Sequence, residues 1–130
     1  MSDYTIKNLK DVDDAALKFG LSPNLEARFA RDPLELEQLG LSYQRLAPNF
    51  RVPFAHKHGT QEEVYVVVSG GGRVKIDDEV HDVRQWDAVR VAPGTMRNFE
   101  AGPDGMELIA IGAPKTPPGD ADTVQGWWID

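Results

Sequence analysis

The chain has 130 residues, a formal net charge of -7 and no cysteine. This length fits one domain with a single apolar core. The negative charge argues against a protein that holds nucleic acid or an anionic membrane through clustered Lys and Arg, and the lack of cysteine excludes disulfides and thiolate ligands. The longest apolar run, residues 64–68, is too short to span a membrane, and the first residues are too charged for a signal peptide. We therefore expect a soluble, cytoplasmic protein with a small-molecule or protein partner.

Residues 1–39 are predicted to form a short helix and irregular structure. Residues 8–19 (NLKDVDDAALKF) are consistent with a helix that Gly20 would end. Apolar and polar side chains alternate over residues 25–30, and residues 40–47 read as a strand that Pro48 and Asn49 close. The pattern then changes to strands.

The middle of the chain is predicted to be β throughout. Short runs rich in valine, isoleucine and aromatic residues cover residues 63–68, 73–76, 80–83, 88–92, 96–101 and 106–111, and they are separated by glycine, proline and aspartate turn signals. Strands at this spacing predict an all-β sandwich or barrel built of hairpins, without helical crossovers. The tail, residues 113–130, contains three prolines and is expected to lie across the barrel or reach a neighbouring chain.

The candidate chemistry is concentrated in residues 54–72, FAHKHGTQEEVYVVVSGGG. Because side chains alternate along a strand, His56 and His58 share one face, and on the next strand Glu63 and Tyr65 share a face that Glu62 does not. By parity alone, either glutamate could be turned inward. Two imidazoles and one carboxylate on converging strands suit Fe, Mn, Ni, Co or Zn and leave coordination positions open.

This stretch resembles the first motif of the cupins, G-x5-H-x-H-x3,4-E-x6-G. The match runs from the first histidine through Glu63 to Gly70, and it favours Glu63 over Glu62 as the third ligand; Phe50 stands where the motif begins with glycine. By this resemblance His56, His58 and Glu63 would bind a divalent metal.

Residues 86–101 resemble the second cupin motif, G-x5-P-x-G-x2-H-x3-N, less closely. Gly94 matches, whereas Trp86, Ala92, Arg97 and Ala101 replace the other motif residues. The resemblance covers about residues 40–112 and implies a single domain, residues 1–130, with a small jelly-roll β-barrel that is usually dimeric. It also implies a small-molecule ligand.

Arg97 stands where the family has its usual fourth ligand, a histidine. Its parity with Phe99 predicts that the side chain points inward, and a guanidinium cannot bind a metal. In one reading the metal stays on His56, His58 and Glu63 while Arg97 holds a substrate carboxylate or the outer oxygen of Glu63. In the other reading Arg97 pairs with Glu63 and the pocket contains no metal.

Other residues have less specific interpretations. Tyr65, Phe99 and Glu62 are candidate pocket residues besides Arg97, whereas His81 is expected on the surface. Trp127 and Trp128 are predicted to pack against the barrel or a dimer partner. Three functions remain open: a metal-dependent enzyme of oxygenase or isomerase type, a small-molecule binding module, and a structural dimer module.

Overall fold

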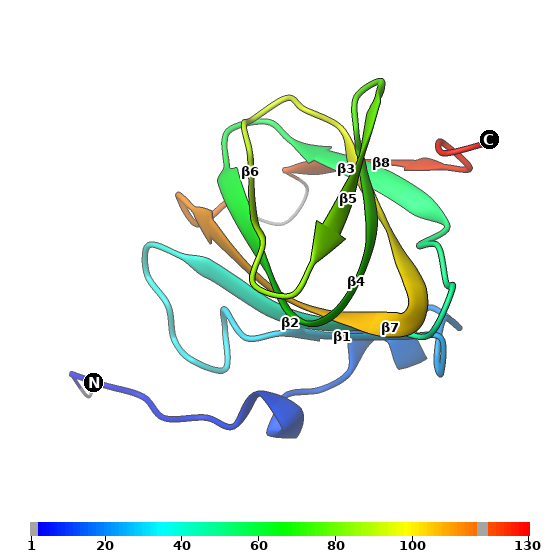
Figure 1. The fold of residues 1–130 in the computed structure, drawn as a ribbon. Helices are drawn as coiled ribbons and strands as arrows, with labels where there is room; N and C mark the ends of the chain where they lie inside the picture. Colours follow the sequence, from blue (N-terminus) through cyan, green and yellow to red (C-terminus); the bar gives the residue numbers. More distant parts are fainter. Residues whose placement is uncertain (1–2, 117–119) are drawn as a thin grey trace.

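The computed structural model of the protein describes residues 3–116 and 120–130. Within them, eight strands form one sheet with the order β1-β2-β7-β3-β8, while β4 pairs with β5, β6 and β7. Figure 1 shows that this sheet curls around on itself, as the predicted jelly-roll barrel requires. The strands are β1 (Leu25–Phe29), β2 (Gly40–Leu46), β3 (Phe54–His58), β4 (Glu62–Ile76), β5 (Glu79–Arg84), β6 (Ala88–Val91), β7 (Arg97–Ala113) and β8 (Ala121–Gln125).

The two long strands β4 and β7 each join two of the predicted short runs. The triple glycine at residues 70–72, expected to turn the chain, lies inside β4, where the pairing with β7 shifts register between Gly70 and Gly72. Gly70 has a φ of +70°, and a Cβ there would lie 2.0 Å from the carbonyl oxygen of Gly105. The glycines therefore form a bulge that lets β4 continue in close contact with β7.

The N-terminal segment forms two short 3-10 turns instead of the single helix predicted over residues 8–19. They cover Leu9–Asp11 and Ala15–Leu17 and begin at Asn8 and Asp14, whose side chains accept hydrogen bonds from backbone N–H groups two residues ahead. Such local bonds compete with a continuous helix. Among the described residues, no helix is long and apolar enough to cross a bilayer.

Glu26 on β1 connects the N-terminal segment to the barrel. Its side chain is 8% exposed and forms ion pairs with Lys10, Arg28 and Arg45 at 2.6, 2.6 and 3.1 Å. Burial alone would raise the pKa of this carboxyl, but hydrogen bonds from the three cations outweigh burial and lower its pKa from 4.5 to about 2. Glu26 is therefore ionised in the folded protein.

We expect Glu26→Gln to lower the free energy of unfolding at pH 7 by up to about 3 kcal/mol, because the folded state favours the ionised carboxyl. The contribution of ionised Glu26 to the free energy of unfolding is fully present above pH 4.5 and is lost as pH falls toward 2. The difference between the two proteins should therefore narrow by about 2 kcal/mol from pH 7 to pH 3, measured by urea denaturation. Glu37→Gln, at an exposed position, is the control, and a difference that does not change with pH would contradict this role.

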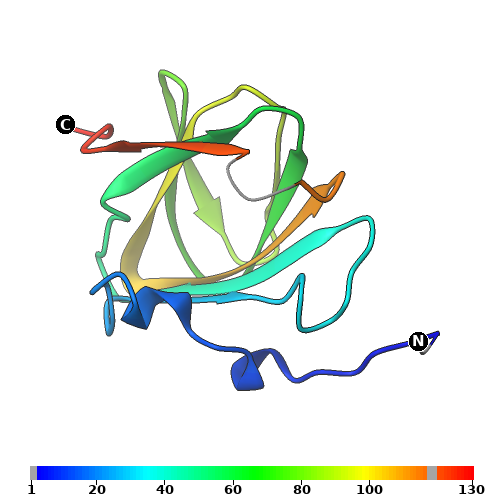
Figure 2. The ribbon, with the colours of Figure 1, turned by 180° about the vertical axis from the view of Figure 1, so that it is seen from behind.

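The C-terminal tail closes one side of the barrel. β8 pairs antiparallel with β3, with His56 opposite Thr123 and His58 opposite Ala121. Figure 2 shows this red strand lying along β3, on the opposite side of the molecule from the N-terminal turns. Neither β8 nor its pairing with β3 was predicted from the sequence. The prolines precede β8, and the strand itself contains none.

Trp127 and Trp128, the two tryptophans of the tail, pack against residues of the same chain. Trp128 is 5% exposed, and the Arg51 guanidinium lies 4.2 Å from its ring centroid. Arg51 also donates a hydrogen bond of 3.0 Å to the Trp128 carbonyl oxygen. The neighbouring ring of Trp127 is partly buried, with the Lys75 amine 4.4 Å from its centroid. The tail therefore ends on the barrel surface, as a packing role predicts.

Candidate metal centre

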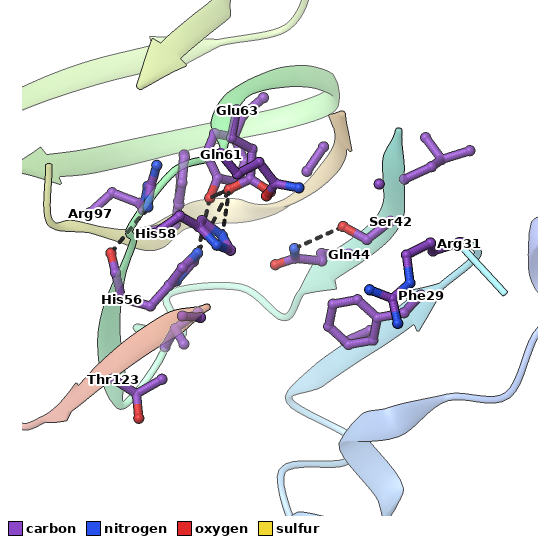
Figure 3. Close-up of a pocket in the computed structure, with 18 of the residues that line it drawn as sticks. Phe29, Arg31, Ser42, Gln44, His56, His58, Gln61, Glu63, Arg97 and Thr123 are labelled. Atoms are coloured by element: carbon purple, nitrogen blue, oxygen red, sulfur yellow. Dashed lines mark hydrogen bonds and ion pairs between the residues drawn. The ribbon is translucent and has the colours of Figure 1, made fainter. Parts of the chain in front are cut away.

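His56, His58 and Glu63 converge at one end of an internal cavity. β3 presents both imidazoles on its inner face, and β4 presents the carboxylate opposite them (Figure 3). The Nε2 atoms of His56 and His58 lie 3.7 and 3.6 Å from Oε1 of Glu63. One potential ligand atom from each residue lies within 4.8 Å of the others. Strand alternation alone explains why the two histidines point the same way.

The surroundings favour the protonation states that a metal needs. Burial lowers the pKa of His56, an effect that the nearby Arg97 strengthens and Glu63 opposes. Burial alone would raise the pKa of Glu63, but the neighbouring imidazoles of His56 and His58 and the hydrogen bond from Tyr65 outweigh burial, so this pKa lies below its ordinary value. A neutral imidazole and an ionised carboxylate are the forms that bind metals. This donor set fits a divalent transition metal.

Tyr65 lies next to His56 and Glu63 and contacts both through its hydroxyl group. Its hydroxyl donates a hydrogen bond to Oε1 of Glu63 and lies 3.3 Å from Nε2 of His56. Tyr65 is 1% exposed, and burial raises the pKa of its phenol well above the ordinary value. It therefore remains a neutral hydrogen-bond donor that orients the Glu63 carboxylate.

Asp120 orients His58 from the C-terminal tail. The Nδ1 atom of His58 lies 3.2 Å from Oδ2 of Asp120, which leaves Nε2 facing Glu63. The backbone N–H of Gly59 also donates to the Asp120 carbonyl oxygen at 3.3 Å. A carboxylate on the second imidazole nitrogen fixes the tautomer and the ring plane of a metal ligand. The sequence contained no spacing signal for Asp120, which lies more than 60 residues after the histidine.

We expect Asp120→Ala to weaken Zn²⁺ or Mn²⁺ binding by about 10- to 100-fold, because the His58 ring loses its fixed orientation. Asp120→Asn should recover part of the loss, since an amide oxygen still accepts the Nδ1 hydrogen bond. Calorimetric titration measures both effects. Asp122→Ala, an exposed position on β8, is the control. Equal affinity in the wild type and Asp120→Ala would show that His58 does not depend on this contact.

Arg97 lies beside the three candidate ligands and is fully buried. It stands opposite His56 in the β3–β7 pairing, and its Nη1 donates to the His56 carbonyl oxygen at 3.4 Å. Within residues 3–116 and 120–130, no acceptor lies within hydrogen-bond distance of its Nε and Nη2. The same residues contain no ion pair between Arg97 and Glu63, which pairs with the histidines. The predicted metal-free arrangement, with Arg97 bound to Glu63, is therefore not the one observed.

The other candidate pocket residues divide into two groups. Tyr65 and Phe99 line the cavity together with Arg97. The prediction that Glu62 is a pocket residue is wrong. Its side chain is 60% exposed and pairs with Arg90 outside the barrel. Parity explains the difference, since consecutive residues of β4 face opposite sides of the sheet. His81 is also exposed, as predicted.

The cavity extends well beyond the metal-binding end and has a volume of about 500 Å³. Figure 3 shows Phe29, Arg31, Ser42 and Gln44 on the opposite side of this space from His56 and Arg97. The sequence did not mark Leu25, Ala27 and Phe29 of β1 as cavity residues, although their alternation was visible. Gln61 is a further unpredicted lining residue; it is buried and donates to the Pro114 carbonyl oxygen at 3.3 Å.

A comparison with curated proteins gives one short match. An uncharacterised protein of Methanocaldococcus jannaschii is 36% identical over 45 residues, which are 35% of this chain and 36% of that protein. The match therefore spans only about a third of its relative's length. Because this relative is uncharacterised, the match assigns no function to the chain.

Solved structures resemble the whole barrel. A cupin protein from Bacteroides fragilis is 25% identical with a TM-score of 0.72, covering 88% of this chain and 86% of that one. Streptomyces Pac13 with uridine is 15% identical with a TM-score of 0.74, covering 96% and 92%. Oxalate decarboxylase from Bacillus subtilis is 22% identical with a TM-score of 0.73, covering 93% and 32%. The last two likenesses show the fold alone.

The family model described as the Cupin domain matches residues 42–112. The match covers more than half of the chain and contains the two histidines, Glu63 and Arg97. It agrees with the observed barrel and with the convergence of the candidate ligands at its inner face. The chain belongs to the cupin family.

Proposed function

We propose that the protein binds one divalent transition metal through His56, His58 and Glu63, and that it binds or transforms a small organic anion beside this metal. The observation that carries the proposal is the convergence of the three ligand atoms within 4.8 Å at the inner end of the cavity. The orientation of His58 by Asp120 and of Glu63 by Tyr65 supports it, because preorganised ligands bind metals more tightly.

Arg97 supports the anionic character of the ligand. A guanidinium carries a positive charge, and burying a charge without a partner is costly. Nε and Nη2 of Arg97, which have no acceptor among the described residues, therefore favour an incoming anion. An anion between Arg97 and the metal would also reduce the repulsion between these two positive charges.

A metal at this position would supply Lewis-acid chemistry to a bound oxygen atom of the ligand. The residues of the chain would do the rest. Arg97 would hold the anion, Tyr65 would keep the Glu63 carboxylate in place, and the barrel wall would exclude water. The homodimer and the cytoplasmic location remain predictions.

Elemental analysis of untagged protein, reconstituted separately with Fe, Mn, Ni, Co and Zn, tests the proposal. We expect about one metal ion per chain for at least one of these metals, because three preorganised ligands suffice for a site with open positions. Metal retained after extensive dialysis would support the proposal. Protein that retains none of the five would contradict it.

A further inference from the structure

We propose that the ligand is an amphipathic organic carboxylate, with the carboxylate on Arg97 and an apolar body along a wall that β1 supplies. This inference rests on the proposed function, because it assigns a ligand class to the same cavity. The Arg97 edge that has no acceptor among the described residues, the lining of the cavity and the size of the cavity support it.

The Nε and Nη2 atoms of Arg97 favour a carboxylate as the head group of the ligand. Nε and Nη2 lie on one edge of the planar guanidinium, and both are buried without an acceptor among the described residues. Two parallel N–H groups on one edge match the two oxygens of a carboxylate. The other cation that lines the cavity is already engaged, since Arg31 bonds to Asp32 and to the Thr116 carbonyl oxygen at 3.1 and 2.6 Å. The carboxylate is therefore expected at Arg97.

The apolar side chains that line the cavity favour a ligand with an apolar body. Apolar side chains from β1, β3, β7 and the segment before β3 line the cavity: Leu25, Ala27, Phe29, Val52, Phe54 and Phe99. Such a wall offers few partners to a ligand rich in hydroxyl groups, and an apolar body gains free energy there by leaving water. Polar side chains such as Gln44 and Asn98 also line the cavity. The Gln44 amide donates to Ser42 at 3.3 Å, and the Asn98 amide donates to the Val52 carbonyl oxygen at 3.0 Å.

The size of the cavity excludes the smallest acids. A volume of about 500 Å³ lies in the range typical for ligands of the size of a drug, and a two-carbon acid would leave most of it unfilled. The β1 part of the wall lies before residue 42, where the match to the family model begins. This chain's own N-terminal segment therefore shapes the part of the cavity that would select the body of the ligand.

Calorimetric titration with four probes tests the ligand class: 3-phenylpropanoate, propanoate, 3-phenylpropan-1-ol and oxalate. Zn²⁺-loaded and metal-free protein are titrated in parallel. We expect 3-phenylpropanoate to bind at least about tenfold more tightly than propanoate or oxalate because of the buried ring. It should also bind at least about tenfold more tightly than the alcohol because of the charged hydrogen bonds.

Variants then assign the two parts of the ligand to the chain. Arg97→Met should weaken binding of the acid by about tenfold or more and leave the alcohol unchanged, and Arg97→Lys, which keeps the charge, should restore only part of the loss. Phe29→Ala should weaken the binding of 3-phenylpropanoate and leave the binding of propanoate unchanged. Phe29 is 55% exposed, so this change should not disturb the core; Phe19→Ala, at 72% exposure and away from the cavity, is the control.

The outcomes separate the two proposals. A protein that binds no metal but prefers 3-phenylpropanoate through Arg97 would contradict the metal centre and support the ligand class. Equal affinity for the acid and the alcohol, equal affinity for 3-phenylpropanoate and propanoate, or no binding of any probe would overturn the ligand class, even if the metal binds.

Discussion

Replacing both His56 and His58 with alanine is expected to lower the affinity for Zn²⁺ or Mn²⁺ by more than about a thousandfold. Loss of one residue that only orients a ligand typically weakens binding by about 10- to 100-fold, and this change removes two of three ligands. Glu63 would remain with Tyr65 as its hydrogen-bond donor, and a single carboxylate does not hold a transition metal firmly. Competition with a chromophoric chelator measures the affinity of both proteins.

His81→Ala is the matched control for the double variant. His81 lies on β5 with a side chain that is 55% exposed, and it pairs with Glu79 at 3.7 Å. Its loss should leave the metal affinity unchanged. A double variant that binds as tightly as the wild type, while His81→Ala binds less tightly, would locate the metal on the surface and not in the barrel.

Replacing Gly70 with alanine is expected to lower the free energy of unfolding by about 2 to 5 kcal/mol. The residue has a φ of +70°, which costs an alanine about 1–2 kcal/mol. Its Cβ would lie 2.0 Å from the Gly105 carbonyl oxygen and 3.2 Å from Cα of Met106, so strands β4 and β7 would have to separate. Overpacking in a well-packed region adds about 1–3 kcal/mol. Urea denaturation followed by circular dichroism measures the loss.

Gly94→Ala separates the two contributions. Gly94 has a φ of +80°, but nothing lies within 4 Å of a Cβ built there. This variant should therefore lose only the backbone term, about 1–2 kcal/mol. If both alanine variants lose the same amount, the contact between Gly70 and Gly105 is relieved at little cost and our account of the bulge is wrong.

The all-β fold was predictable because strands leave a local pattern. Alternation and turn residues marked most strand segments. Parity put His56 and His58 on one shared face and Tyr65 on the same face as Glu63, and in the structure all four side chains line the cavity. The joining of short runs into β4 and β7 was not predictable from local pattern. A glycine cluster is compatible with a turn and with a bulge, and only the pairing with the opposite strand decides between them.

The parts of the site that escaped prediction come from distant segments. Asp120 contacts His58 because β8 pairs with β3, and β8 is an exposed edge strand whose side chains show no buried face. The β1 wall of the cavity depends on how the N-terminal segment folds back onto β2. Such long-range pairings leave no trace in the spacing of residues, whereas two histidines on one strand do.

Anomalous diffraction from crystals soaked with Mn²⁺ or Zn²⁺ tests the central claim most directly. We predict one strong peak about 2.0–2.2 Å from Nε2 of His56, Nε2 of His58 and a carboxylate oxygen of Glu63. The peak should lie at the inner end of the cavity, on the side of Glu63 that faces the two imidazoles. A strong peak at another site, or no peak in crystals that contain the metal, would contradict the assignment of these three residues as ligands.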